Sequence, residues 1–397
     1  MSTDTAARPG DPGTRSGRAA RPRWADDEAV ALGAVARAFF EAEVVPHFER
    51  FDEQKYVDRE VWHKAGALGL MCCEVPAEFG GGGGTFAHDA VVLSEQARAG
   101  DTGFGNMVHS GVVAPLLATY GTDEQRRRWL PGMATGDIIG AVAMSEPGAG
   151  SDLKNIVTRA ERKGDQYVIN GSKTFISNGA RCDLVVVVAK TDPAAGRNGI
   201  SLLALETADA PGFRRGRTLD KLGRHASDTA ELFFDDVSVP AGHLVGEEGR
   251  GLEILKAELP RERLVIAVTA AAAMERALEE TVAYTKTREA FGGPLFAMQH
   301  VRLELAELAT IVRASRVFVD DCIERFVDGT LEPATASMAK WWLTQNQSDV
   351  TDRCLQLFGG YGYMREYLIS RLYVDARAQK IYGGANEVLK DHISRSL

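Results

Sequence analysis

The sequence is short of the features that several protein classes require. Lysine and arginine (46) are outnumbered by aspartate and glutamate (55), and the net charge of −9 argues against generic nucleic-acid binding. The longer apolar runs, such as VTAAAA at 268–273, are well short of a membrane span. The five cysteines show neither paired metal-ligand spacing nor a disulfide framework. We therefore expect no metal site, and buried thiols in a reducing cytoplasm.

The first 24 residues also lack an apolar stretch, which argues against a secretory signal. Arginine outnumbers acid there, so a mitochondrial transit peptide is an alternative. However, prolines and glycines between positions 9 and 17 would interrupt the amphipathic helix of such a peptide. We therefore expect a disordered tail over 1–24 and a cytoplasmic protein, with the mitochondrial matrix as the alternative.

Hydrophobic periodicity divides the rest of the chain into three segments. Residues 25–139 carry apolar residues at three- and four-residue steps, which predicts helices. From 140 to 248, short β-branched or aromatic runs between Gly, Asn, Asp and Pro are typical of an antiparallel sheet or small barrel. Residues 249–397 predict a helix bundle. The predicted fold class is mainly α with a β domain: an N-terminal helical domain, a middle antiparallel β domain and a C-terminal four-helix bundle.

Prolines and capping residues predict several helix ends. Thr122 is expected to cap a helix that ends at Pro131. Pro260 suits the first position of a helix through RERLVIAV, which would put Glu262 in the first turn of that helix. The next helix is expected to carry a buried seam from Val301 to Phe326.

Four features can carry chemistry, and each has a structural alternative. The loop MSEPGAGSDL (144–153) is either a tight turn or a set of open backbone N–H groups for an anionic or carbonyl-rich ligand. LFGGYGYMREY (357–367) is a second glycine-rich turn or a helix end. Gly383 and Gly384 form a helix C-cap or backbone against a ligand. Glu262 is a surface partner of a helix dipole or, if its helix enters a buried bundle, a general base with a raised pKa.

Eight stretches, in this order, resemble the acyl-CoA dehydrogenase family over nearly the whole chain, from about Asp26 to Leu397. They are AMSEPGAGSDL, YVINGSKTFISNGARCDLVVV, KLGRHASDTAELFFDDVSVP, GEEGRGLEIL, ERLVIA, REAFGGPL, QLFGGYGYMREY and IYGGANEV. One such string would be weak evidence, but eight in family order are very specific. Within the family the chain is most similar to the long-chain type, through HSGVVAPLLATYGTDEQ, ELPRERLVIA and YVDARAQKIYGGANEV.

The resemblance implies FAD between the β domain and the bundle, reaching into a neighbouring subunit of a homotetramer. Ser145 would bond the polar edge of the flavin, and Ser151 would lie where the diphosphate and the CoA arm pass. The implied FAD contacts are Val142, Ala143, Met144, Ser145, Gly150, Ser151, Phe175, Ile176, Ser177, Arg288, Phe291, Gln299, Gln356, Leu357, Phe358, Gly359, Gly360, Ala385, Asn386 and Glu387. Those at 288–299 and 356–360 would contact the dinucleotide of the adjacent subunit.

The resemblance also bears on the two glycines. Many family members carry the catalytic glutamate at the position of Gly383, whereas long-chain and isovaleryl types take it from the helix matching LPRERL, which implies Glu262 as the base. The Gly383 N–H, with a flavin ribityl hydroxyl, would form the oxyanion hole. The implied substrate contacts are Ser151, Pro260, Arg261, Arg263, Gly383 and Gly384. Both positions would face the same α-carbon, so Glu262→Ala with Gly383→Glu is expected to recover some activity.

The implied activity is the α,β-dehydrogenation of an acyl-CoA thioester to the trans-2-enoyl-CoA, with a long or branched chain. The implied pathway is fatty acid β-oxidation, and the implied electron acceptor is an electron-transferring flavoprotein. An acyl group bound to a carrier protein is an alternative substrate, and O₂ is an alternative acceptor, as in acyl-CoA oxidases or nitroalkane oxidases. A non-catalytic DNA-binding relative is disfavoured by the acidic total charge and the intact flavin motifs.

Overall fold

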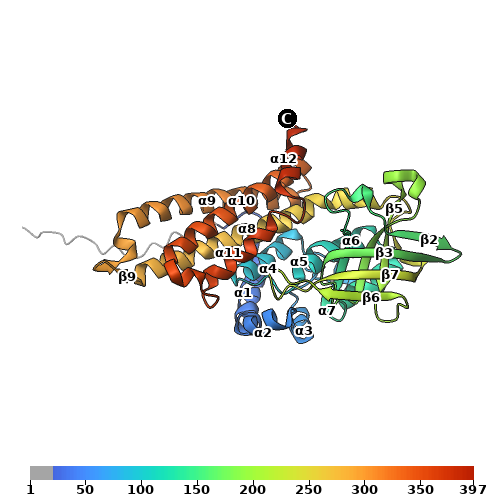
Figure 1. The fold of residues 1–397 in the computed structure, drawn as a ribbon, viewed down its shortest axis with the longest axis horizontal. Helices are drawn as coiled ribbons and strands as arrows, with labels where there is room; N and C mark the ends of the chain where they lie inside the picture. The colour runs from blue at the N-terminus through green and yellow to red at the C-terminus, as the bar shows by residue number, and fades with distance from the viewer. Residues whose placement is uncertain (1–20) are drawn as a thin grey trace, which may run out of the picture.

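A computed structural model describes residues 21–397 (Figure 1). Of the tail predicted over 1–24, the first 20 residues lie outside the described residues. The predicted fold class is confirmed, since a helical part, a mainly antiparallel sheet and a helix bundle follow one another. All five cysteines are buried free thiols, as expected. Among residues 21–397, no helix is long and apolar enough to cross a membrane.

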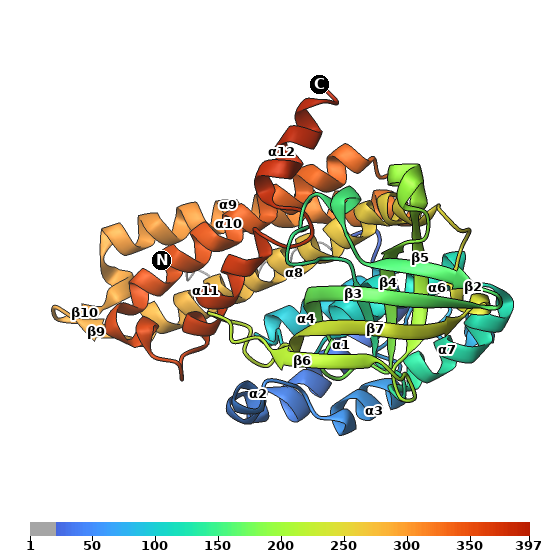
Figure 2. The same ribbon diagram turned by 45° about the vertical axis from the view of Figure 1, so that its right-hand side comes forward.

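The first helices pack below and beside the sheet (Figure 2). They are α1 (Asp27–Phe39), α2 (Phe48–Gln54), α3 (Arg59–Ala67), α4 (Phe86–Arg98), α5 (Asn106–Val108), α6 (Ala114–Tyr120) and α7 (Asp123–Thr135). The cap at Thr122 is confirmed, because its Oγ1 accepts a hydrogen bond from Gln125 N at 3.2 Å. The prediction that this helix ends at Pro131 is wrong. Trp129 and Met133, on either side of the proline, are buried, and this packing offsets the roughly 3 kcal/mol that a proline costs within a helix.

The middle of the chain forms one sheet of eight strands. They are β1 (Gly140–Ala143), β2 (Arg159–Lys163), β3 (Gln166–Ser177), β4 (Leu184–Lys190), β5 (Ile200–Glu206), β6 (Phe213–Thr218), β7 (Thr229–Pro240) and β8 (Leu244–Val245). The order is β6-β7-β3-β2-β4-β5-β8, and β1 pairs in parallel with β4. A separate hairpin joins β9 (Glu289–Ala290) to β10 (Gly293–Pro294).

Strand β4 is apolar from Leu184 to Ala189 because both of its faces are buried there. Leu184, Val186 and Val188 belong to the same core as the N-terminal helices. Val185 and Val187 belong to the second core, on the other face of the sheet. Side chains of a strand alternate between its two faces, so the run LVVVV connects the two cores, and the sheet is anchored to the helical part.

The C-terminal part is a bundle around one long helix (Figure 1). Its helices are α8 (Gly251–Thr287), α9 (Gln299–Val327), α10 (Pro333–Phe358), α11 (Leu368–Gln379) and α12 (Asn386–Ser394). The predicted start of α8 at Pro260 is wrong, since the helix begins at Gly251 and Pro260 lies inside it. Buried residues on both sides, such as Leu255 and Leu264, hold the two halves in one helix. Glu262 therefore lies eleven residues into α8 rather than in its first turn.

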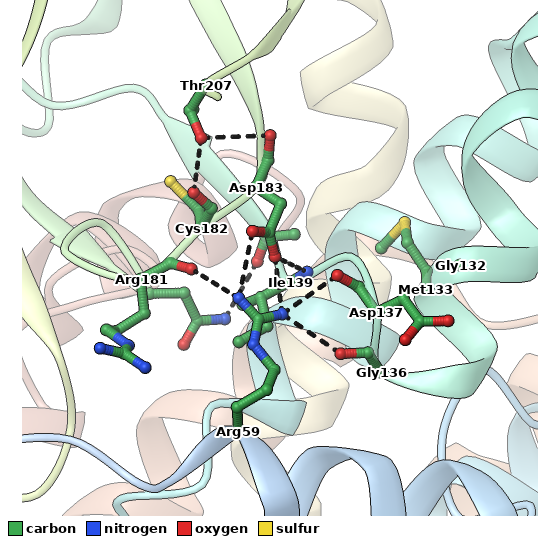
Figure 3. Close-up of polar contacts among 12 residues, drawn as sticks. Arg59, Gly132, Met133, Gly136, Asp137, Ile139, Arg181, Cys182, Asp183 and Thr207 are labelled. Atoms are coloured by element: carbon green, nitrogen blue, oxygen red, sulfur yellow. Dashed lines mark hydrogen bonds and ion pairs between the residues drawn. The ribbon is translucent and has the colours of Figure 1, made fainter. Parts of the chain in front are cut away.

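Arg59 joins the helical part to the sheet (Figure 3). Its guanidinium group donates to both carboxylate oxygens of Asp183, at 2.7 and 3.1 Å, and to the carbonyl oxygen of Asp137 at 3.2 Å. Asp183 also accepts a hydrogen bond from Ile139 N at 2.8 Å. A bidentate pair of this kind fixes orientation as well as distance, so α3 holds the chain where it enters the sheet.

Candidate active site

The Glu262 side chain lies against the turn between α11 and α12. A Cβ atom placed on Gly383 would lie 3.6 Å from Glu262 Oε1 and only 2.2 Å from Ile266 Cδ1. Glu262 and Ile266 are four residues apart in α8, so their side chains share one face of the helix. The structure therefore brings together the predicted base and the predicted oxyanion donor.

Gly383 and Gly384 adopt backbone conformations that favour glycine. Their φ angles are +62° and +88°, in the left-handed region, and a side chain at 383 would have to displace the end of the Ile266 side chain. Within residues 21–397, the Gly383 N–H donates no hydrogen bond, so it can bind a ligand. Helix α11 already ends at Gln379. The glycine pair is therefore a turn facing Glu262 and not the cap of that helix.

The surroundings of Glu262 suit a general base. Burial raises the pKa of Glu262, and the positive charges of Arg263 and Lys340 lower it only in part. A base is most effective when its pKa is shifted towards the working pH while it remains ionised there. A partly buried carboxylate next to a free backbone N–H can take a proton from one atom of a ligand while the N–H stabilises charge on another.

Lys340, which the sequence did not identify, holds the glycine turn in place. Its Nζ donates to Gly384 O at 2.7 Å and to Asn386 Oδ1 at 3.2 Å. Lys340 is fully buried in α10, and burial lowers its pKa to about 8, against the opposing effect of Glu262. A single lysine in the helical stretch SMAKWW predicts an exposed side chain, so the sequence carried no clear signal for this contact.

The start of α12 contains three predicted cofactor contacts. Ala385 is the residue before the helix, and Glu387 lies exposed in its first turn. The Asn386 side chain is buried, and its Oδ1 accepts hydrogen bonds from both Lys340 and Thr344. Asn386 thus anchors the turn, whereas Ala385 and Glu387 remain open to a ligand.

The residues next to Glu262 that are predicted to bind substrate are buried or partly buried. Arg261 donates to both oxygens of Glu74 at 2.7 and 2.8 Å, and Arg263 Nη1 donates to Ser337 Oγ at 2.9 Å. Both arginines are buried, and Pro260 is partly exposed. The two guanidinium groups already have protein partners, which favours a structural role for them.

A buried ion pair locks the loop after β1 to β3. Lys173 Nζ donates to Glu146 Oε1 at 2.9 Å and to Met144 O at 3.0 Å, and the two charged side chains are 0% and 2% exposed. Thr174 N also donates to Ser145 O at 3.0 Å. The sequence did not identify this pair, although a glutamate inside a glycine-rich loop was the available signal. The pair fixes the loop of residues 144–153, here called the rim, beside the end of β3.

The open side of this rim suits a flavin. The Phe175 side chain is 70% exposed, and Ser151 is also exposed. A Cβ atom at Gly148 or Gly150 would meet nothing within 4 Å, so the backbone there is open to close approach. An exposed aromatic ring beside hydroxyl and backbone N–H groups fits a flat ring system with a polar edge. The residues present here therefore fit FAD.

Other predicted contacts on this rim differ in exposure. Ala143 and Ile176 are 0% and 2% exposed and pack in the sheet core, so only their backbone atoms remain for a ligand. Val142 is partly buried, and Ser177 lines a cavity between the sheet and the bundle.

The remaining predicted cofactor contacts lie at the far end of the bundle, away from the sheet (Figures 1 and 2). Arg288 follows α8, and its guanidinium group lies 5.3 Å from the Tyr361 ring centre. Phe291, in the β9–β10 turn, is 97% exposed. The others are Gln299 at the start of α9, and Gln356, Leu357, Phe358, Gly359 and Gly360 at the end of α10.

One copy of the chain does not bring the far-end residues together with the cofactor contacts predicted on the rim and at the start of α12. Lys340 contacts the glycine turn, and Gln356 lies sixteen residues further along the same helix, about 24 Å away. Within residues 21–397, the far-end residues of α10 therefore lie well away from the glycine turn of the same copy.

Comparisons with known proteins agree with this geometry. The models for the N-terminal, middle and C-terminal domains of acyl-CoA dehydrogenase match residues 26–137, 141–237 and 249–397. The mitochondrial long-chain specific acyl-CoA dehydrogenase of Mus musculus is 47% identical over 363 residues, 91% of this chain and 84% of that protein. The crystal structure of an acyl-CoA dehydrogenase from Geobacillus kaustophilus has a TM-score of 0.92 at 45% identity, covering 95% of this chain and 99% of that one. A glutaryl-CoA dehydrogenase from Mycobacterium smegmatis, in complex with FADH2, has a TM-score of 0.88 at 28% identity, covering 94% and 95%.

Three family models in sequence, close relatives along nearly the whole chain, and a carboxylate facing a glycine turn all lead to one assignment. The chain belongs to the acyl-CoA dehydrogenase family, the FAD-dependent oxidoreductases that act on acyl-CoA thioesters.

Proposed function

We propose that this enzyme converts a long- or branched-chain acyl-CoA to the trans-2-enoyl-CoA, with Glu262 as the base. The observation that supports this most strongly is the 3.6 Å between Glu262 Oε1 and the Cβ position of residue 383. A glutamate on α8 thus reaches the space that a glutamate at 383 would occupy. Because residue 383 is glycine, Glu262 and Ile266 of α8, rather than a side chain of the turn, occupy the space beside it.

The chain's own residues would divide the work as follows. The thioester carbonyl accepts a hydrogen bond from the Gly383 N–H, which stabilises the enolate that forms when the α-proton leaves; one such donor is typically worth about 10²–10³ in kcat. The Glu262 carboxylate takes the α-proton, a contribution of roughly 10²–10⁴. Lys340 holds Gly384 and therefore the position of the neighbouring N–H. When bound, FAD supplies the two-electron acceptor for the β-hydrogen, so that the C2–C3 double bond forms.

The rim residues would hold the flavin, and the far-end residues would hold part of the FAD of another copy. This proposal rests on the separation of the two sets in one chain, where sixteen residues of α10 divide Lys340 from Gln356. A homotetramer in which paired subunits exchange these contacts would complete each site. Sedimentation of the FAD-loaded protein tests this, because a monomer that retains FAD and full activity would contradict it.

We further propose an electron-transferring flavoprotein as the electron acceptor, and a cytoplasmic location. A carrier-protein-bound acyl group and O₂ are the alternatives. Anaerobic titration of the purified enzyme with acyl-CoAs of increasing length and branching tests the substrate. Bleaching of the flavin by free long or branched acyl-CoAs is the expected result. Bleaching by carrier-bound acyl groups alone would overturn the CoA assignment, and rapid O₂ uptake without added acceptor would overturn the proposed acceptor.

A further inference from the structure

A cavity of about 50 Å³ lies between the bundle and the sheet, further along the face of α8 that carries Glu262. Thr269 and Ala273 line it, and together with Ile266 they follow Glu262 at steps of four, three and four residues, on one side of the helix. Thr269 and Ala273 lie about 10 and 17 Å beyond Glu262 along the helix axis. These residues therefore lie away from the position of the reacting carbons. The distal end of an acyl chain bound at Glu262 would lie on this side.

The cavity wall is partly apolar but contains three buried amides. Phe104, Met107, Val108 and Leu372 supply apolar surface. Gln96 from α4, Gln347 from α10 and Gln379 from α11 also line the cavity, and they are only 5%, 2% and 4% exposed. In the part of the chain that the structure describes, the side-chain oxygens of all three have no hydrogen-bond partner. Buried polar groups are nearly always paired, so three unpaired oxygens around one cavity point to a missing ligand group.

The orientation of Gln96 shows which kind of group is missing. Its Nε2 donates to Asp101 Oδ2 at 2.8 Å and to Phe104 O at 2.6 Å. Both partners only accept hydrogen bonds when the aspartate is ionised, so exchanging the amide oxygen and nitrogen would break both bonds. The free atom of Gln96 is therefore an acceptor, and it requires a donor such as a hydroxyl group.

We propose that this cavity receives the distal part of the acyl chain, and that the preferred substrates carry a hydroxyl group there. The inference rests on the proposed acyl-CoA dehydrogenation, and it adds the substrate class. A purely alkyl chain would cover the three amides without pairing them, which is unfavourable. A hydroxyl group donates to one amide oxygen and can accept from the Nε2 of another. The hydroxyl lies far from C2 and C3, so it takes no part in the reaction.

The test compares three acyl-CoAs of equal chain length with the FAD-loaded enzyme. One is unsubstituted, one has a terminal hydroxyl group, and one has a terminal methoxy group, which accepts but does not donate. We expect kcat/KM for the hydroxylated chain to exceed that for the methoxy chain by about tenfold or more. Equal values for the two, or a preference for the unsubstituted chain, would overturn the inference and show that water fills the cavity.

Substitutions of the cavity glutamines test whether they cause the preference for the hydroxylated chain. Gln347→Met and Gln379→Met, made separately, are each expected to remove most of the preference for the hydroxylated chain. Gln345→Met, whose amide donates to Asp349 on the outer side of α10, is the matched control and should retain it. A preference that persists in both cavity variants would contradict the role of these amides. If none of the three acyl-CoAs bleaches the flavin, the proposed function itself fails, whereas bleaching without discrimination overturns the hydroxyl preference alone.

Discussion

Moving the base from α8 to the glycine turn should require a shorter side chain at Ile266. In the combination Glu262→Ala with Gly383→Glu, the new Cβ would lie 2.2 Å from Ile266 Cδ1 but 3.7 Å from Ile266 Cγ1. The first distance is a clash and the second an ordinary contact. Ile266→Val removes only the Cδ1 atom. The recovery of activity expected from the sequence for the double variant should therefore be small until Ile266 is changed as well.

The expected energies predict that Ile266→Val changes the stability of the wild type and of the relocated-base variant in opposite directions. In the wild-type protein, Ile266→Val leaves a small cavity and should cost about 0.5–1.5 kcal/mol of stability. In the relocated-base variant, the clash costs about 1–3 kcal/mol, and the positive φ at 383 adds roughly 1–2 kcal/mol for any side chain. Ile266→Val relieves the clash but not the backbone strain. It should therefore stabilise the variant, although it destabilises the wild type.

Urea unfolding of four proteins measures this coupling: wild type, Ile266→Val, the relocated-base variant, and the variant with all three changes. We expect a coupling free energy of about 1–3 kcal/mol, and flavin bleaching that is faster in the triple variant than in the double. If Ile266→Val destabilises both backgrounds equally, Ile266 does not pack against residue 383 as described, and the proximity of Glu262 to that turn would also be in doubt.

The other predictions concern pH, the lysine and the join to the sheet. Because burial raises the pKa of Glu262 above its usual 4.5, the base becomes protonated, and kcat/KM should fall, at a pH above 4.5; a profile that is flat down to 4.5 would refute this. Lys340→Met removes a charge that lowers the pKa of Glu262, so it should move this fall to higher pH and reduce kcat, whereas Lys390→Met, on the ring of Trp341, should leave both unchanged. Arg59→Ala should lower the free energy of unfolding by about 1–2 kcal/mol without changing the bleaching rate; equal urea midpoints would show that this contact contributes nothing.

The sequence was sufficient for the fold class, because hydrophobic periodicity changes clearly from helix to strand and back. It failed at two helix ends, for one reason. Pro131 and Pro260 both predict a boundary from local backbone chemistry, but buried side chains on either side keep α7 and α8 continuous. Tertiary packing of this kind is not visible in a local pattern.

The candidate site was only partly predictable. The motifs indicated Glu262 and the glycine pair, yet their meeting depends on how α8 and the α11–α12 turn pack. Lys340 and the Glu146–Lys173 pair are charged side chains that become buried through partners distant in sequence. A charged residue predicts surface exposure, so such contacts appear only once the fold is known.

Glu262→Gln tests the assignment of the base most directly. The substitution keeps the shape of the side chain and removes its ability to take a proton. Glu280→Gln, in a surface ion pair of the same helix, is the control. We predict that Glu262→Gln binds FAD and acyl-CoA but bleaches the flavin at least about 10²-fold more slowly than the wild type, whereas the control bleaches normally. Bleaching at the wild-type rate in Glu262→Gln would contradict the role of Glu262.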